Sequence, residues 1–97
     1  MTEVRRNDEL SRWEAVVDGH VVGFAQAVVR GDVVEIPHTE VDREYGGQGI
    51  AGDIVRRALD DISADGQQVA PTCPYVATWI RRHPEYAPLV AGSLGES

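Results

Sequence analysis

A glycine-rich segment in the middle of the chain is the feature with the clearest capacity to bind a ligand. Residues 46–51 read Gly-Gly-Gln-Gly-Ile-Ala and lead directly into an apolar pattern typical of a helix. Small residues at such a turn let successive backbone amides approach an anion, and the dipole of the following helix reinforces them. The segment therefore predicts a site for a phosphate or pyrophosphate group, although a purely structural turn explains the glycine spacing equally well.

The glycines also match the fingerprint of dinucleotide-binding Rossmann folds over residues 47–52. That fingerprint requires a tight turn directly after a parallel strand and an acidic residue about 20 positions later. Here residues 42–46 separate the preceding apolar run from the glycines, and residues 67–71 contain no acid. A Walker loop is excluded because the chain contains no lysine. Pyrophosphate binding outside a Rossmann fold is the interpretation that remains.

Three other side chains combine reactive chemistry with a defined position. Cys73, the only cysteine, directly precedes Pro74, a residue favoured in the first turn of a helix. A thiol at the positive end of a helix is stabilised as thiolate. His38 and Glu40 lie two positions apart, so a strand would place both on one face of a sheet. Each also has a simpler interpretation: an inert, half-buried cysteine, a histidine that packs on the sheet, and a solvated strand end.

The elements that must position these residues follow from the hydrophobic pattern. Turn signals at Asp18-Gly19 and Gly31-Asp32 separate three β-rich runs, which predicts an antiparallel meander. Pro37 lies in the third run and should occupy an open side of the ladder or a bulge. Apolar residues then recur at helical spacing, and a glycine cap is expected at Gly66. The expected elements are strands over 13–17, 21–29, 33–41 and 67–71, the last one parallel, and helices over 50–65 and 75–82.

The bulk composition limits the fold and the partners. With 97 residues, of which 42% are apolar, the chain has room for one hydrophobic core. We expect a single domain over 1–97, with a core of about 11–90 and a mobile tail over 91–97. The formal charge of −7 argues against nucleic acid or an anionic membrane as a partner.

The cysteine count and the N-terminal residues indicate the cellular compartment of the protein. One cysteine allows neither an intramolecular disulfide nor a tetrathiolate zinc site, and we expect no metal site. The N-terminal residues lack the apolar region of a secretory signal, and no run approaches the ~20 apolar residues of a membrane span. The sequence therefore predicts a cytoplasmic protein.

Four short motifs occur in a fixed order along the chain. They are His-Thr-Glu-Val at 38–41, the glycine segment, Cys-Pro-Tyr at 73–75 and His-Pro-Glu-Tyr at 83–86. Together they resemble the small YjdJ-type branch of the GNAT N-acetyltransferase superfamily. The superfamily's loop pattern begins with Arg or Gln, and Gly46 departs from it at that position. The resemblance implies a single-domain, minimal GNAT-like α+β fold with an antiparallel meander, glycine loop, helix, parallel strand and C-terminal helix.

By this resemblance the chain binds acetyl-CoA or coenzyme A. The strands before and after the helix would diverge, leaving backbone groups of Glu40 and Val41 to pair with the amides of pantetheine. Cys73 would lie near the acyl group, as a nucleophile or as a residue that restricts the thiol end. Glu40, assisted by His38, would act as general base toward an incoming amine. The implied cofactor-binding residues are Val41, Gly46, Gly47, Gln48, Gly49, Ile50 and Ala51.

Two functions are compatible with this site. One is an N-acetyltransferase that moves an acetyl group to an amine, and the other is a non-catalytic acyl-CoA-binding or sensor module. The chain is short for the superfamily, so the acceptor side should be open, which favours a macromolecular amine or a homodimer partner. The helix after the fourth strand offers Tyr75 and Trp79 where larger members often place a tyrosine acid, and the sequence assigns that role to neither.

Overall fold

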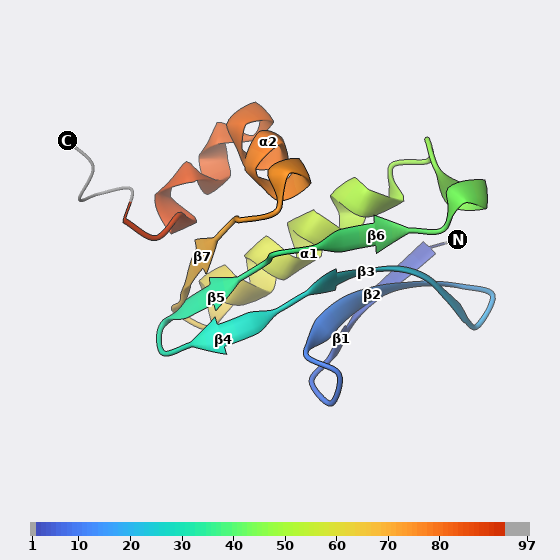
Figure 1. The fold of residues 1–97 in the computed structure, drawn as a ribbon, viewed down its shortest axis with the longest axis horizontal. Helices are drawn as coiled ribbons and strands as arrows, with labels where there is room; N and C mark the ends of the chain where they lie inside the picture. Colours follow the sequence, from blue (N-terminus) through green and yellow to red (C-terminus); the bar gives the residue numbers. More distant parts are fainter. Residues whose placement is uncertain (1, 93–97) are drawn as a thin grey trace.

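Seven short strands form two sheets that pack against the same long helix, as Figure 1 shows for the computed structural model. The structure describes residues 2–92. One sheet has the strand order β1-β2-β3-β6 and the other the order β4-β5-β7, and every pairing is antiparallel except that of β5 with β7. This arrangement confirms the predicted α+β fold with its parallel return strand. The strands are β1 (Thr2–Asn7), β2 (Arg12–Val17), β3 (His20–Gln26), β4 (Val28–Arg30), β5 (Val33–Glu35), β6 (Thr39–Val41) and β7 (Gln68–Ala70).

The second predicted strand, over 21–29, is divided into β3 and β4. The division falls at Ala27, whose amide donates to the carbonyl of Ser11 over 2.9 Å instead of joining the ladder to the next strand. Because its hydrogen bonds change partner here, one continuous segment contributes to both sheets. The hydrophobic pattern alone could not reveal this division, since apolar residues run through it.

The third predicted strand, over 33–41, is divided at Pro37 into β5 and β6. Before the proline, the amide of Ile36 donates to the carbonyl of Ala70 over 3.0 Å. After it, the carbonyl of His38 accepts from the amide of Gln26 over 2.9 Å. Pro37 has no amide to donate. It therefore lies where the chain leaves the partner β7 and joins β3, which agrees with the open position predicted for it.

Strand β1 is an element that the sequence did not predict. Its residues include Glu3, Arg5 and Arg6, so it lacks the apolar alternation by which strands are recognised. It nevertheless pairs with β2 along its whole length, and Val4 packs against the core. The sheet thus extends beyond the expected core of about 11–90.

A buried carboxylate ties β1 to β2. The side chain of Glu14 is only 1% exposed, and its two oxygens accept hydrogen bonds from Arg5 at 3.0 Å, Asn7 at 3.0 Å and Arg12 at 2.7 Å. A buried charge is tolerated when it is paired and hydrogen-bonded in this way. Three partners from two strands therefore fix the register of this hairpin.

Helix α1 (Ile50–Ala64) supplies most of the contacts that hold the two sheets together. Its apolar face is buried as the helical spacing predicted. The helix ends as expected at Gly66, which adopts a φ of 72°. The amide of Gln67 donates to the carbonyl of Ile62 over 3.0 Å, and that of Gly66 donates to Ser63 over 3.1 Å, the pattern of a Schellman cap. The buried residues are Ile50, Ile54, Val55, Ala58, Leu59 and Ile62.

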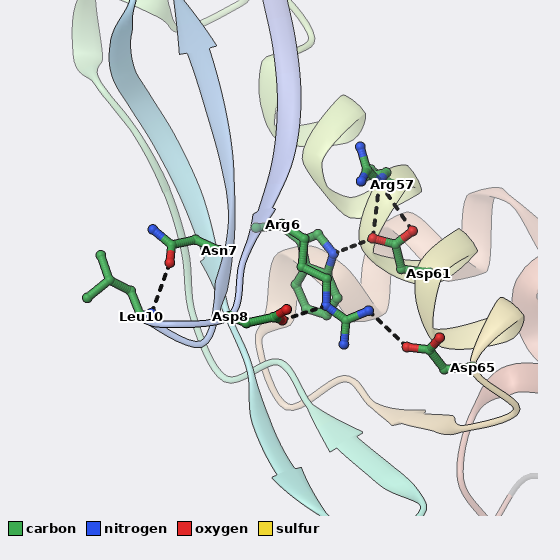
Figure 2. A network of polar contacts seen from close by, with 8 residues as sticks. Arg6, Asn7, Asp8, Leu10, Arg57, Asp61 and Asp65 are labelled. Carbon is green, nitrogen blue, oxygen red and sulfur yellow. Dashed lines mark hydrogen bonds and ion pairs between the residues drawn. The ribbon is translucent and has the colours of Figure 1, made fainter.

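Polar side-chain contacts connect the hairpin of β1 and β2 to the C-terminal half of α1, as Figure 2 shows. The indole nitrogen of Trp13 donates to Asp61 over 2.8 Å, and Arg57 binds the same carboxylate at 3.0 Å. Arg6 reaches from β1 to Asp65, at the C-terminal end of the helix, over 2.8 Å. These side chains hold β1 and β2 in place over the helix that carries the glycine loop at its other end.

Helix α2 (Pro74–Arg82) and the 3-10 helix η2 (Pro84–Leu89) complete the fold. Helix α2 ends before His83, as predicted, and the ring of His83 stacks on Trp79 at 3.8 Å. Tyr86 packs against the core. Trp79 is 8% exposed, with Arg56 above its ring at 5.2 Å. Trp79 is therefore a packing residue between the two helices.

The chain stays attached to the sheet beyond η2. Val90 forms a parallel bridge with Val69, and the amide of Ala91 donates to the carbonyl of Val69 over 2.8 Å. The mobile tail over 91–97 stays a prediction, since Ala91 bonds to the sheet and residues 93–97 lie outside the described residues. Within the described range, no helix is both long and apolar enough to cross a membrane.

We expect Glu14 to make the stability of the fold depend on pH in the acid range. Burial raises the pKa of this carboxyl, but hydrogen bonds from Arg12, Arg5 and Asn7 outweigh burial and hold the pKa below its usual value. Such a group stabilises the fold above its unfolded pKa of about 4.3, and this stabilisation is lost as the pH falls through the folded pKa. The free energy of unfolding in urea should therefore fall below about pH 4.3 in the wild type.

The variant Glu14→Gln tests this, with Glu9→Gln as its control, because Glu9 is exposed. Glu14→Gln should be less stable than the wild type at neutral pH and should lose less stability on acidification. Glu9→Gln should follow the wild type. Parallel pH profiles for all three proteins would contradict a stabilising role for the Glu14 carboxylate.

Candidate active site

The glycine loop connects the 3-10 helix η1 (Arg43–Tyr45) to α1. Gly47 and Gly49 have φ values of 80° and 78°, in the left-handed region that only glycine adopts readily. A Cβ atom added to either one would meet no protein atom within 4 Å. The loop therefore needs glycine for its backbone conformation, and the space in front of it is open.

The N-terminus of α1 supplies hydrogen-bond donors to this space. The first intrahelical bond runs from the amide of Asp53 to the carbonyl of Gly49 over 3.1 Å. The amides of Ile50, Ala51 and Gly52 precede it, and the first amides of a helix have no partner within the helix. They lie at the positive end of the helix dipole. The chain thus offers a group of free donors suited to an anion.

A hollow of about 260 Å³ lies over the loop. Six of the seven predicted cofactor-binding residues line it, and Gln48 does not. Tyr45 and Tyr75 line it as well, although neither was among the predicted site residues. The lining residues are Val41, Tyr45, Gly46, Gly47, Gly49, Ile50, Ala51 and Tyr75.

Gly52, the last glycine of the apparent dinucleotide fingerprint, has a packing role instead. A Cβ atom at this position would lie 3.2 Å from the indole nitrogen of Trp79 and 3.6 Å from the hydroxyl of Tyr75. The absence of a side chain lets α2 approach the first turn of α1. This close approach brings α2 to the edge of the hollow.

The outer edge of β6 is open. The carbonyl of His38 accepts from Gln26, and the amide of Asp42 donates to Val22 over 2.7 Å. Glu40, midway between them, is paired with Phe24. Bonded pairs recur at every second residue of an antiparallel ladder, so the backbone of Glu40 faces β3.

Thr39 and Val41 direct their backbone groups to the other side of β6. There β7 has already ended at Ala70, and β6 has no second partner strand among residues 2–92. The two strands diverge as expected. The register corrects one detail, because Val41 and Thr39, and not Glu40, direct their backbone groups to this open side.

Cys73 lies beside this open edge. It is the N-cap of α2, its amide donates to the carbonyl of Ile36 over 3.0 Å, and its side chain is 6% exposed. The sulfur lies 3.5 Å from the hydroxyl oxygen of Thr39. Burial raises the pKa of the thiol, but hydrogen bonds from the Thr39 hydroxyl and from the amides of Val76, Tyr75 and Thr39 outweigh it. The pKa of Cys73 therefore lies below its usual value.

His38 and Glu40 form a pair on the opposite face of β6. The Nε2 atom of His38 lies 3.1 Å from Oε1 of Glu40, and both side chains are more than half exposed. This face also carries Phe24, whose ring lies 6.0 Å from that of His38. The next residue on β3, Gly23, points toward Ile54 of α1, so the pair lies on the face away from the helix. The structure thus brings His38 to Glu40 and Cys73 to Thr39, but separates the pair from the thiol.

A second hollow, of about 240 Å³, adjoins the exposed pair. Glu40 is among its lining residues. The residues that line it are Arg12, Val21, Gly23, Phe24, Glu40 and Asp42.

A family model described as "GCN5-related N-acetyl-transferase" matches residues 12–89. The chain belongs to this acetyltransferase family. The protein "Protein NATD1" is 33% identical to it over 52 residues, in both the human and the chicken sequences. These residues cover 54% of this chain, 46% of the human protein and 47% of the chicken protein. The chain spans about half the length of the curated relatives that it matches.

Two solved acetyltransferases share the fold. The ribosomal-protein-S18-alanine N-acetyltransferase from Escherichia coli superposes with a TM-score of 0.62 and 17% identity, over 75% of this chain and 50% of that one. The ribosomal-protein-alanine N-acetyltransferase from Brucella melitensis biovar Abortus 2308 has a TM-score of 0.51 and 21% identity, over 82% and 62%. The likeness confirms the expected GNAT-like fold.

Thr39 and Tyr45 were not predicted from the sequence, and Tyr75 was named there without an assigned role. Thr39 could have been found from strand alternation, which places it on the face opposite His38 and Glu40. Tyr45 immediately precedes the loop, but a tyrosine in a turn carries no specific signal. The placement of Tyr75 depends on how closely α2 approaches α1, and a pattern along the chain does not encode that distance.

We expect the rate of Cys73 alkylation by iodoacetamide to rise with pH about a midpoint below the ~8.5 of a free thiol. Restricted access of the reagent to the sulfur lowers the absolute rate, whereas the midpoint reports the pKa of the thiol. Thr39→Val removes the hydroxyl bond and should move the midpoint upward. Thr72→Val is the matched control, because the Thr72 hydroxyl donates to Glu35. A wild-type midpoint at or above the free-thiol value would contradict the assigned environment.

Proposed function

We propose that this chain binds acetyl-CoA and transfers the acetyl group to an amine, and that it belongs to the small YjdJ-type branch of its family. One observation carries the proposal: the glycine-loop hollow reaches Val41, and the open edge of β6 continues from there to Thr39 and Cys73. This order of loop, strand edge and thiol matches the order of pyrophosphate, pantetheine and thioester in the cofactor.

The residues around the loop suit an anionic cofactor. The formal charge of −7 repels anions at long range, so any attraction must come from nearby donors. The first amides of α1 provide such donors. The open space in front of Gly47 and Gly49 leaves room for the anion. In this proposal residues 46–51 hold the pyrophosphate, with Gln48 contributing through its backbone, and Val41 pairs with pantetheine.

The proposed reaction uses residues on both faces of β6, Cys73 on one face and Glu40 with His38 on the other. When bound, acetyl-CoA supplies an acetyl group activated as a thioester. The thiolate of Cys73 forms a new bond to the acetyl carbon as the bond to the cofactor sulfur breaks, and the departing sulfur takes up the proton that Cys73 has lost. Glu40 with His38, on the other face of β6 from Cys73, accepts through water the proton that the amine loses as it takes the acetyl group from Cys73.

A non-catalytic acyl-CoA-binding module is the alternative function. It is favoured by the exposure of His38 and Glu40, which leaves the proposed base open to water. An open acceptor side also suits a macromolecular amine or a second copy of the chain as partner. The cytoplasmic location is part of the proposal and is based on the single cysteine. The exclusion of nucleic acid and anionic membranes as partners is also part of it and is based on the acidic composition.

We expect coenzyme A to raise the melting temperature, because a ligand that binds only the folded state stabilises it by mass action. Gly49→Ala should weaken binding at least about tenfold, because its Cβ occupies the space in front of the amides. Gly31→Ala is a matched control, since Gly31 also has a positive φ, 63°, and no protein atom within 4 Å of an added Cβ.

Each of these two substitutions should cost about 1–2 kcal/mol of folding free energy, the penalty for a left-handed residue with a Cβ. Only Gly49→Ala should also lose affinity for coenzyme A in calorimetric titration. Equal affinities for the two variants would place the anion elsewhere on the protein.

Turnover separates the two proposed functions. Acetyl transfer from labelled acetyl-CoA to a panel of amines and lysine peptides should be measured, with mass spectrometry for acetyl-Cys73. Cys73→Ala should lose nearly all turnover but should still bind acetyl-CoA. Glu40→Gln should lower the rate of transfer about 10²-fold or more, and Glu44→Gln should not.

Two other outcomes would change the proposal. If Cys73→Ala kept full turnover while Glu40→Gln lost it, the amine would attack the thioester directly and Cys73 would only pack beside it. If the wild type bound coenzyme A but transferred nothing and never acquired an acetyl group, the binding module would be the function.

A further inference from the structure

The hydroxyl of Tyr75 lies beside the glycine loop and makes no side-chain hydrogen bond within residues 2–92. Of the three tyrosines, Tyr86 is satisfied, because its hydroxyl donates to Asp60 over 2.8 Å and lies 3.4 Å from Arg56. Among the side-chain hydrogen bonds within residues 2–92, none involves the hydroxyl of Tyr75 or Tyr45. Both of these tyrosines line the loop hollow.

The contact with Gly52 locates the Tyr75 hydroxyl over the first turn of α1. It lies 3.6 Å from the position that a Cβ of Gly52 would occupy, an ordinary van der Waals distance. Tyr75 itself is the second residue of α2, which positions its ring at the start of that helix. The hydroxyl and the free amides of α1 therefore face the same space.

The hydroxyl is available as a donor at neutral pH. Burial and the nearby charge of Asp53 raise the pKa of Tyr75, and Arg82 lowers it by less. The proton thus remains on the oxygen, and a protonated phenol can donate to an anion.

The lining of the hollow leaves few side-chain donors for an anion. No lysine or arginine lines it, and Gly46 at the start of the loop has no side chain. The hydroxyl of Tyr75 can add to the donors that the backbone amides supply. A hydrogen bond to a charged group contributes more than one between neutral groups.

We propose that the Tyr75 hydroxyl donates a hydrogen bond to the pyrophosphate held by the glycine loop, and so serves as a specificity-determining residue for a phosphorylated cofactor. This inference rests on the proposed function. It gives Tyr75 a role at the phosphate end of the site, whereas the sequence had left open whether this tyrosine acts as an acid at the thiol end. The hollow that Tyr75 lines contains the loop and does not include Cys73.

The test is calorimetric titration of coenzyme A into Tyr75→Phe and Tyr86→Phe. Tyr75→Phe should weaken binding about tenfold, the effect of losing one hydrogen bond to a charged group. Tyr86→Phe removes the same atom outside the hollow and should bind as the wild type does. Thermal melting of the ligand-free variants checks folding, and Tyr75, which is 43% exposed, should tolerate the change.

Phosphorus NMR of bound coenzyme A gives a second readout at saturating ligand. Tyr75→Phe should shift the pyrophosphate resonances and leave the 3′-phosphate resonance in place. Unchanged affinity and unchanged pyrophosphate resonances in Tyr75→Phe would overturn the inference while the proposed function stands. An equal loss of affinity for coenzyme A in Tyr75→Phe and Tyr86→Phe would also overturn the inference. If the wild type fails to bind coenzyme A at millimolar concentration, the proposed function fails, and the inference fails with it.

Discussion

The change of hydrogen-bond partner around Pro37 is the constraint on which the rest of the site depends. Before the proline, the backbone of Ile36 pairs with β7, and after it the backbone of His38 pairs with β3. Since the proline has no amide, the ladder cannot continue through it in either sheet. Strands β6 and β7 must then separate, and their separation leaves the edge of β6 unpaired. The first helix, the glycine loop and the thiol of Cys73 all border this one opening.

The opening persists because close packing holds β6 against β3 on its other side. A Cβ atom on Gly23 would lie 2.8 Å from the carbonyl oxygen of Glu40 and 3.3 Å from Ile54 of α1. Only a residue without a side chain lets the strand, its neighbour and the helix meet there. The helix in turn is fixed by the Trp13–Asp61 contact. The open edge of β6 therefore lies beside a closely packed contact of β3, β6 and α1.

The sequence predicted what depends on local periodicity and missed what depends on distances between elements. Helix α1, its cap at Gly66 and the loop before it were predicted because apolar spacing and glycine chemistry act over a few residues. Strand β1 could not be predicted, since it is polar and is held by its pairing with β2. The direction of the Glu40 backbone required the register, and the position of Tyr75 required the approach of α2 to Gly52.

The charged residues of β1 also bear on how the protein behaves at high concentration. An outer strand offers unpaired backbone groups to any other extended chain, and such contacts lead to aggregation. Here Glu3, Arg5 and Arg6 occupy that strand, so a second chain would bring like charges together or strip water from them. Edge-to-edge growth of the sheet from β1 is thereby discouraged. A pair of these molecules would have to associate through another surface, and the N-terminal edge would keep them dispersed.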